Sequence, residues 1–274
     1  MVLLVRIRSR PESRLKARPE YYRGNKSLTL DMSRNIFLTA EWLDLAMLNY
    51  SVDPQLLFNH VPPGTSLDSF EGKTYVSLVG FRFCRTKLFD LVPVPFHTNF
   101  EEVNLRFYVR RREAAEERRG VVFIAEIVPK RAVAQLARLA YAENYVRFPM
   151  GHTNIENGAT KAVEYRWRLK SGWCKLRAQS SSAPAYAQEG SLEQFITEHY
   201  WGYTKQRNGS TVEYRVAHVP WKVWASSSAG FDGDARSLYG PELGEIIQRR
   251  PDSAFIADGL PIAVFRGRRI APTG

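Results

Sequence analysis

Four polar side chains alternate with apolar ones near residue 105, and their types suit the binding of an anion. Glu102, Asn104, Arg106 and Tyr108 form one series, and valine, leucine and phenylalanine residues stand between them. A period of two places the two series on opposite faces of a β-strand. A guanidinium held by a carboxylate and an amide can bind a carboxylate or phosphate through two hydrogen bonds. The spacing therefore predicts a strand with a core face and a ligand-binding face; a solvated face or a structural Glu–Arg pair is the alternative.

Glu126 stands alone in an apolar run. Residues 121–128 are otherwise apolar, which predicts a strand buried on both faces and joined to the first strand by a charged turn. A buried carboxylate needs a partner. Arg106 and Arg82 are the expected partners, so Glu126 joins the candidate ligand-binding residues.

Two histidines lie beside aromatic residues, His199 in EHYW and His218 in HVPW. Neither has a second histidine or cysteine at metal-ligand spacing, so no metal site is predicted. An imidazole can act as an acid, a base or a ligand contact near neutral pH. His218 is therefore a candidate ligand-binding residue, with a structural histidine of a sheet as the alternative. No glycine-rich phosphate loop occurs, and no cofactor is predicted.

The composition indicates a soluble protein with a hydrophobic core. The 274 residues are 44% hydrophobic and 24% charged, enough for one large domain or two small ones. No apolar run is long enough to cross a membrane. Cys84 and Cys174 are far apart and match no metal spacing, which favours reduced thiols and a cytoplasmic location.

The net charge of +11 is concentrated at the start of the chain. Residues 1–31 hold eight lysines and arginines against three acidic residues and lack strand or helix periodicity. We therefore expect a disordered basic extension over residues 1–31 and a single domain over residues 32–274. The alternatives for residues 1–31 are an upstream extension with the functional start at Met32 and an arm that binds nucleic acid or a membrane surface. Nucleic acid is not the expected partner of the domain.

The rest of the chain is dominated by strand patterns with a few short helices, which predicts an α+β fold. Strands are predicted at 74–84, 103–109, 121–128, 163–169, 173–176 and 211–219, and a pair of strands is predicted across 253–267. Helices are predicted at 54–61, 132–145, 192–196 and 241–250. Loops are predicted at 88–100, 151–162 and 179–187. The helix starts rest on Asp53-Pro54 and on Ser191 with Gln194, which are capping patterns. Asn208-Gly209 predicts a hairpin turn.

Several stretches resemble the YqjF-like family of uncharacterised bacterial proteins. They are AEWLDLAMLNYSVDPQLL and VPPGTSLD near the start, NFEEVNLRFYVRR and RGVVFIAEIVP in the middle, and SLEQFITEHYWGY with HVPW later. Their order and spacing cover nearly all of residues 35–270. That family is similar in fold to acetoacetate decarboxylase. The resemblance implies a curved antiparallel sheet closed into a barrel-like cone, with short flanking helices and an internal ligand cavity.

The resemblance also implies a catalytic candidate, Lys130. The decarboxylases use a Pro-Lys-Lys step whose first lysine forms a Schiff base, and Pro129-Lys130-Arg131 occupies the corresponding place. A lysine is nucleophilic only when neutral, and desolvation with a neighbouring cation favours that form, as in the decarboxylases themselves. The partners differ, however. Ala40 stands where the decarboxylases have an arginine and Ser77 where they have a glutamate, and their second glutamate has no clear counterpart, which counts against decarboxylation by their route.

Three functions are therefore expected in turn. The first is a protein that binds a small anionic or carbonyl-bearing molecule in a barrel cavity. The second is a Schiff-base enzyme of decarboxylase or aldol type acting through Lys130. The third is association with nucleic acid through the basic extension. The sequence leaves the ligand and the oligomeric state open, with a homo-oligomer as one alternative.

Overall fold

The computed structural model describes residues 35–93, 98–113, 116–129, 144–158 and 160–270. Contacts divide the chain into residues 1–35 and residues 36–274, and every element described below belongs to the second unit. The predicted basic extension and the predicted helix after Pro129, apart from its last two residues, lie outside the described residues.

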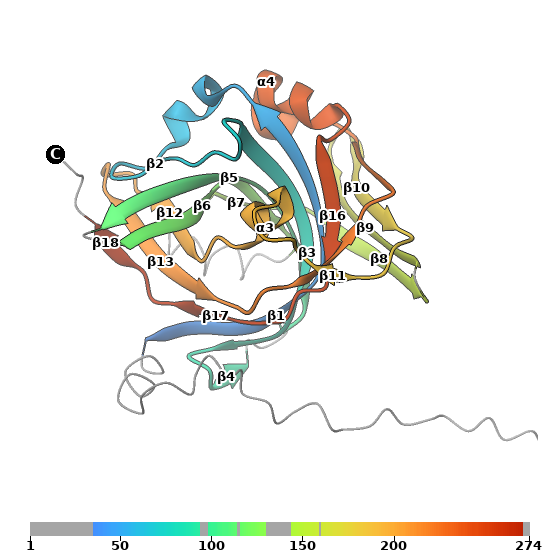
Figure 1. Ribbon diagram of the computed structural model, residues 1–274, viewed down its shortest axis with the longest axis horizontal. Coiled ribbons are helices and arrows are strands. Elements are labelled where there is room, and N and C mark those ends of the chain that lie inside the picture. Colours follow the sequence, from blue (N-terminus) through green and yellow to red (C-terminus); the bar gives the residue numbers. More distant parts are fainter. Residues whose placement is uncertain (1–34, 94–97, 114–115, 130–143, 159, 271–274) are drawn as a thin grey trace, which may run out of the picture. The chain divides into compact units, whose positions relative to one another are not determined.

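Within this part of the chain, seven strands pair in a ring (Figure 1). In order around the ring they are β1 (Ile36–Val52), β17 (Pro261–Phe265), β13 (Thr211–Ala217), β12 (Trp201–Lys205), β6 (Glu116–Val128), β5 (Phe100–Glu113) and β3 (Thr74–Leu88), which pairs with β1 again. The predicted strand-rich α+β fold is confirmed. The sheet is mixed rather than wholly antiparallel, because β6 pairs in parallel with β12 and with β7 (Tyr145–Arg147).

Shorter strands extend this sheet. They are β2 (Ser66–Leu67) beside β5, β4 (Val92–Pro93) beside β3, β18 (Arg268–Ile270) beside β13, and the series β16 (Ser253–Ala257), β14 (Lys222–Ala225) and β11 (Ala185–Tyr186) that continues from β1. The strands β16 and β17 do not pair with each other across Asp258-Gly259, as a hairpin would. Instead β16 pairs with residues 45–49 of β1 and β17 with residues 36–41, so the two lie in succession along one long strand.

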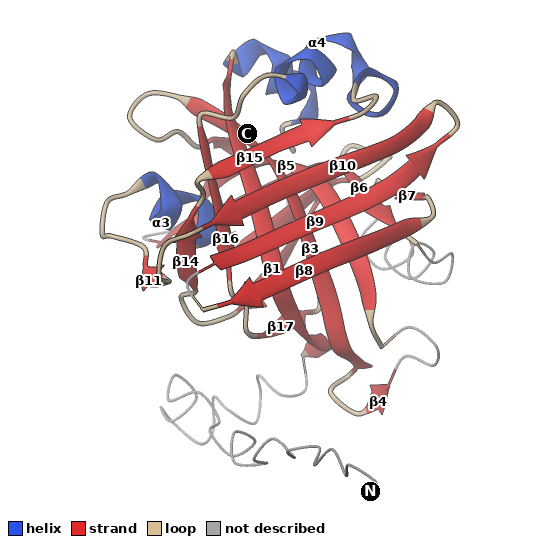
Figure 2. Ribbon diagram, turned by 90° about the vertical axis from the view of Figure 1, so that its right-hand side faces the viewer, coloured by secondary structure: helices blue, strands red, loops and turns tan. Residues whose placement is uncertain are grey.

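A second sheet of four antiparallel strands lies against the outer side of β1 and β3 (Figure 2). Its strands are β8 (Met150–Asn157), β9 (Thr160–Leu169), β10 (Gly172–Ser180) and β15 (Ser228–Asp232). The prediction of a loop over residues 151–162 is wrong, since β8 and the start of β9 occupy it. β8 is an edge strand that pairs only with β9, and most of its side chains are exposed. Its polar residues therefore lack the alternation that indicates a strand.

Two of the described helices begin where their capping residues predict. Asp53 accepts a hydrogen bond from the Gln55 amide at the start of a 3₁₀ helix, η2 (Pro54–His60), and Ser191 accepts one from Gln194 at the start of α3 (Leu192–Thr197). The third helix, α4 (Arg236–Gln248), begins before the predicted Pro241. Gly240 has a φ of 80° there, which produces a kink directly before the proline.

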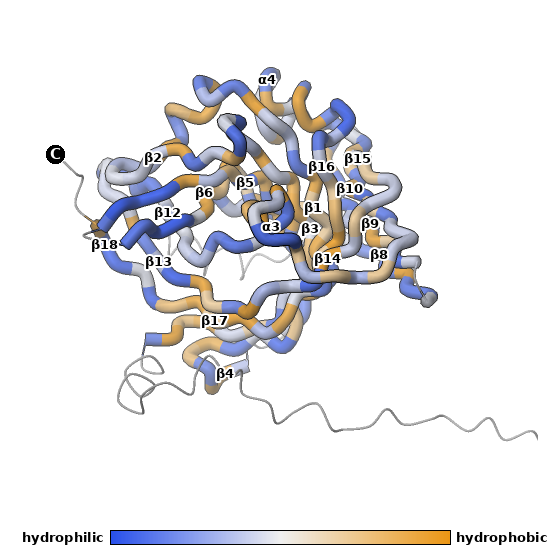
Figure 3. The backbone as a smooth tube through the Cα atoms, in the orientation of Figure 1, coloured by the Kyte–Doolittle hydropathy of each residue, from blue (hydrophilic) through white to orange (hydrophobic). Residues whose placement is uncertain are grey.

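The alternation in β5 separates two environments, as predicted. Val103, Leu105, Phe107 and Val109 are fully buried in a cluster with residues of β9 and β10, such as Trp167, which is where the two sheets meet. Figure 3 shows hydrophobic residues gathered along these facing strands, while the tip of the β5–β6 hairpin is hydrophilic. The polar series of β5 consequently faces the inside of the ring.

Two bulges redirect side chains within the ring. The β1–β3 register shifts between Leu43 and Ala46, where Asp44 has a φ of 57°, a left-handed conformation that aspartate tolerates. The β5–β6 register shifts between Leu105 and Arg106. Each bulge inserts an extra residue into one strand. As a result, Trp42 and Leu45 both line the inside of the ring although they are three positions apart. The same holds for Phe123 and Glu126.

Candidate functional site

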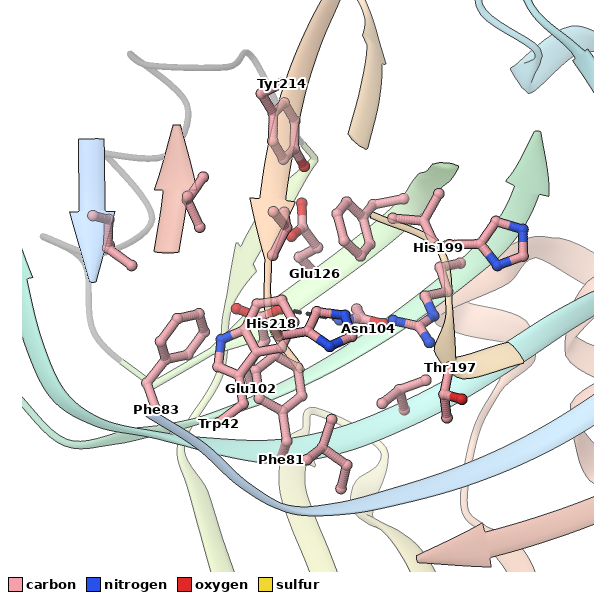
Figure 4. Close-up of a pocket in the computed structure, with 18 of the residues that line it drawn as sticks. Trp42, Phe81, Phe83, Glu102, Asn104, Glu126, Thr197, His199, Tyr214 and His218 are labelled. Carbon is pink, nitrogen blue, oxygen red and sulfur yellow. Dashed lines mark hydrogen bonds between the residues drawn. The ribbon is translucent and has the colours of Figure 1, made fainter. Parts of the chain in front are cut away.

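A cavity of about 120 Å³ lies inside the ring, and all seven ring strands contribute side chains to it. Its described lining includes Trp42 of β1, Phe81 and Phe83 of β3, Glu102, Asn104 and Arg106 of β5, Phe123 and Glu126 of β6, Trp201 of β12, Tyr214 of β13 and Val264 of β17, together with Ile196, Thr197, His199, His218 and Trp221. Figure 4 shows several of these side chains converging from different strands. The structure therefore brings five of the six predicted ligand-binding residues to one cavity.

Glu102, Asn104 and Glu126 form the polar floor of this cavity. All three are at least 98% buried, and the Asn104 amide donates a 3.0 Å hydrogen bond to Glu102. The Tyr145 hydroxyl lies 3.4 Å from the other oxygen of Glu102. Asn104 stands opposite Glu126 in the β5–β6 register, and Glu126 stands opposite Tyr145 in the β6–β7 register. Three neighbouring strands thus place polar groups in one row.

Arg106 presents a buried positive charge to the cavity. The residue is 93% buried, and its Nη2 donates to the backbone carbonyl of Ile196 at 3.3 Å. Its Nε has no hydrogen-bond partner, and no carboxylate of the described residues lies within ion-pair distance of the guanidinium. Desolvating a cation without a counter-ion is costly, so this guanidinium favours an incoming anion.

The predicted pairing of Glu126 with Arg106 or Arg82 is wrong. Arg82 instead donates a 2.6 Å hydrogen bond to Asp44, the residue at the β1 bulge. The bulge could not be located from the sequence, so this acceptor for Arg82 could not be anticipated. Both glutamates and Arg106 line the cavity, and no described ion pair joins Arg106 to either glutamate.

Tyr108, the sixth predicted residue, is fully buried and is not among the described residues that line the cavity. Its hydroxyl lies 2.6 Å from Ser77, which donates to the Asn49 side chain at 2.6 Å. The Ser77 hydroxyl has one proton, so Tyr108 donates to Ser77 in turn. Arg106 lies over the Tyr108 ring at 5.7 Å. Tyr108 and Ser77 therefore support the arginine from beneath.

His218 lines the cavity as a neutral imidazole. Its ring stacks on Trp221 with centroids 4.2 Å apart, and its Nδ1 lies 3.0 Å from the Val219 carbonyl. A carbonyl only accepts, so Nδ1 carries the proton and Nε2 is the acceptor. Burial lowers the pKa of His218 to about 4; the Val219 carbonyl opposes this shift, and the nearby Arg106 charge adds to it.

His199, which the sequence did not single out as a ligand contact, also lines the cavity. Its Nε2 lies 3.2 Å from Asp68, which accepts a 2.7 Å hydrogen bond from Arg119 as well. Burial lowers the pKa of His199 to about 4 despite the opposing effect of Asp68. Its Nδ1 is buried without a hydrogen-bond partner among the described residues. No local pattern indicates the Asp68 contact, because 131 positions separate the two residues.

One side of the cavity is aromatic. Trp42 contacts Phe81, Phe83 and Trp221 with ring centroids 5.2, 5.9 and 6.1 Å apart, and Phe83 stacks on Phe100 at 4.6 Å. The apolar positions of β3 were visible in the sequence, but their meeting with Trp42 and Trp221 was not. We call Trp42, Phe81, Phe83, Phe100 and Trp221 the aromatic wall.

The predicted nucleophile Lys130 lies outside the described residues. It follows β6 two positions after Val128. Of the two residues predicted to replace charged partners of the decarboxylases, Ala40 is buried and Ser77 hydrogen-bonds with Asn49 and Tyr108.

The described residues also contain no cluster of histidine, cysteine, aspartate or glutamate able to hold a metal ion. None of the described helices is long and apolar enough to cross a membrane.

Comparison with solved structures shows the fold. The acetoacetate decarboxylase of Legionella pneumophila superimposes with a TM-score of 0.60 at 11% identity, covering 86% of this chain and 87% of that one. An acetoacetate decarboxylase-like enzyme of Sphingomonas wittichii RW1 gives 0.60 at 13% identity, covering 88% and 96%. The enduracididine biosynthesis enzyme MppR complexed with pyruvate gives 0.60 at 11%, covering 86% and 91%. At these identities the likeness establishes an acetoacetate decarboxylase-like fold and no activity.

Sequence comparison identifies the family. The uncharacterized protein YqjF of Bacillus subtilis strain 168 is 28% identical over 205 residues, which is 73% of this chain and 82% of YqjF. The model of the DUF2071 family, described as an uncharacterized conserved protein, matches residues 39–261. Both findings confirm the resemblance drawn from the sequence motifs. The chain belongs to the DUF2071 family of uncharacterized conserved proteins.

Proposed function

We propose that the protein binds a small molecule with a carboxylate or similar anionic group in the cavity of the ring. The observation that carries the proposal is Arg106, a buried guanidinium that faces the cavity without a carboxylate partner in the described structure. An anion that pairs with it compensates a desolvated charge, and the planar guanidinium suits two-point recognition of a carboxylate.

The neighbouring groups are consistent with this ligand class. Both His199 and His218 are neutral at physiological pH, since their pKa values are lowered to about 4, so Arg106 is the cation that the described lining offers to an anion. The neutral His218 offers an acceptor at Nε2, and Asn104 offers an amide whose oxygen is buried without a partner. These groups can hydrogen-bond a hydroxyl or an amine beside the anionic group.

Calorimetric titration with a panel of carboxylic acids, each compared with its uncharged amide, tests the proposal. Each acid that binds should bind more tightly than its amide, by about tenfold or more, because only the acid pairs with Arg106. Amides that bind as well as their acids, or no binding by any acid, would contradict an anion site.

A second candidate function is Schiff-base chemistry through Lys130. Two observations favour it. Lys130 stands two positions after the strand that carries Glu126, and the fold relative MppR has been solved with pyruvate and with the condensation product of pyruvate and imidazole 4-carboxaldehyde. In such a step the neutral lysine amine attacks a keto carbon, and water leaves as the imine forms.

Borohydride reduction in the presence of keto acids tests this step. Incubation with pyruvate and a larger 2-oxo acid, followed by reduction and intact-mass measurement, should give an adduct that peptide mapping assigns to Lys130. Lys130→Arg keeps the charge but cannot form an imine, so it should give no adduct. An adduct that persists in Lys130→Arg, or no adduct with either acid, would remove the enzyme function and leave the binding function.

A further inference from the structure

We infer that the ligand is an elongated aromatic acid, with its carboxylate at Arg106, its ring against the aromatic wall, and an oxygen acceptor at the end of the ring. The inference rests on the proposed anion-binding function and specifies its ligand class. Three features of the cavity carry it: the distance between its two ends, the composition of the aromatic wall, and two indole groups without hydrogen-bond partners.

The charged and aromatic ends are separated along β5. Inward-facing positions follow one another at Phe100, Glu102, Asn104 and Arg106, and Phe100 stacks on Phe83 of the wall. Strands rise about 3.3 Å per residue, so the backbone of Arg106 lies roughly 13 Å along β5 from that of Glu102. Glu102 stands opposite Phe81 of the aromatic wall in the β3–β5 register. A two- or three-carbon acid bound at Arg106 would leave the wall uncovered, whereas a ligand with a ring beyond its acid group reaches both.

The wall is suited to a planar ring. Its members contact one another through tilted and edge-to-face arrangements, with Phe81 and Phe83 at 5.3 Å in addition to the Trp42 contacts. Aromatic pairs favour these arrangements, and a ligand ring can add to the same set. His218, stacked on Trp221, also lines the cavity and continues the wall with a polar edge.

Two indole groups of the wall lack hydrogen-bond acceptors. The Nε1 atoms of Trp42 and Trp221 are both buried, and neither has a partner in the described part of the chain. Trp221 as a whole is 97% buried, and both residues line the cavity. Buried indole N–H groups usually find an acceptor. A ring oxygen on the ligand would supply one at the aromatic wall.

Three stable acids separate these features: propionate, 3-phenylpropionate and 3-(4-hydroxyphenyl)propionate, titrated by calorimetry. We expect 3-phenylpropionate to bind about tenfold or more tightly than propionate, since it buries its ring. The hydroxylated acid should bind more tightly again. Trp221→Phe keeps an aromatic ring but removes one N–H, so it should reduce the advantage of the hydroxyl; Trp42→Phe should show which indole provides the contact.

Trp173→Phe is the matched control, because Trp173 is 43% exposed on β10 of the outer sheet, and it should change no affinity. Equal binding of propionate and 3-phenylpropionate would overturn the inference and leave the anion site standing. If the hydroxyl of the third acid does not change the affinity, or changes it equally in the unmodified protein, Trp42→Phe and Trp221→Phe, then the ligand oxygen does not accept from these indole groups. No binding by any of the three acids would instead remove the proposed function itself.

Discussion

Replacing Arg106 with methionine should weaken the binding of a carboxylate ligand by about a hundredfold or more. Removing one member of a buried charge pair typically costs 2 to 5 kcal/mol of binding free energy, roughly 30- to several-thousand-fold in affinity. Methionine has a similar length and flexibility, so it fills the space without the charge. The dissociation constant of 3-phenylpropionate, measured by calorimetry for both proteins, provides the test.

The same substitution should leave the free energy of unfolding unchanged or raise it by about 1 to 4 kcal/mol. Arg106 has a hydrogen bond to Ile196 but no counter-ion among the described residues, and replacing such a buried charge with a packed apolar group is often stabilising. Urea unfolding measures this change. Arg177→Met is the control, because Arg177 is about half exposed on the outer sheet and pairs with Glu164 at 2.7 Å.

The control should alter neither affinity nor stability appreciably, since exposed ion pairs contribute little. A loss of binding with retained or increased stability marks a residue kept for function rather than for folding. Unchanged affinity in Arg106→Met would show that the anion does not bind at this arginine. A large loss of stability would show that Arg106 has a structural partner that compensates its charge.

Acidification from pH 6.5 to pH 4 should destabilise the protein by several kcal/mol. The pKa values of His199 and His218 are lowered to about 4 in the folded state, against 6.5 for an ordinary histidine. The unfolded chain therefore binds protons that the folded chain excludes, and stability falls as the pH drops through this window. For the fully buried His199 the shift corresponds to about 3 kcal/mol, and the partly exposed His218 contributes less.

Urea unfolding at a series of pH values checks this expectation. His199→Gln should remove the larger part of the loss between pH 6.5 and 4, and His218→Gln a smaller part. Asp68 affects stability in a different pH range. Its pKa is lowered to about 2 in the folded state, so its contribution to the free energy of unfolding is retained above pH 3.8 and is lost as the pH falls toward 2. If both glutamine variants keep the full pH dependence, then the two imidazoles are not the groups that titrate.

The strand that carries the polar series could be predicted because its information is local. The alternation from Glu102 to Tyr108 specifies both faces of β5 through the period of two alone. The caps at Asp53 and Ser191 and the Asn208-Gly209 turn are also local, and the structure has each where it was expected.

The remaining features depend on partners distant in sequence. The bulges at Asp44 and between Phe123 and Glu126 follow from how β1 and β6 match their neighbours, which no local pattern specifies. The aromatic wall requires Trp42 and Trp221 to meet across the ring, and the pairing of Arg82 with Asp44 requires the bulge. The sequence therefore predicted five polar residues that line the cavity, but not the lining by His199 and the aromatic wall, nor how these groups are arranged.

The arrangement favours binding over decarboxylation by the route of the fold relatives. Ser77, which the sequence motifs predict at the place of a decarboxylase glutamate, is hydrogen-bonded to Asn49 and Tyr108. It supports the arginine and presents no carboxylate to a substrate. The Arg106 guanidinium is a buried cation in this site, which supports our proposal that the site holds an acid group.

The most direct test of this account is a crystal structure of the protein with 3-phenylpropionate. The account predicts both carboxylate oxygens within hydrogen-bond distance of the Arg106 guanidinium and the phenyl ring against Trp42 and Phe81. An acid bound in the opposite direction, with its carboxylate among the aromatic rings, would contradict the assignment of the two ends. An acid bound outside the ring of strands would contradict the proposed site altogether.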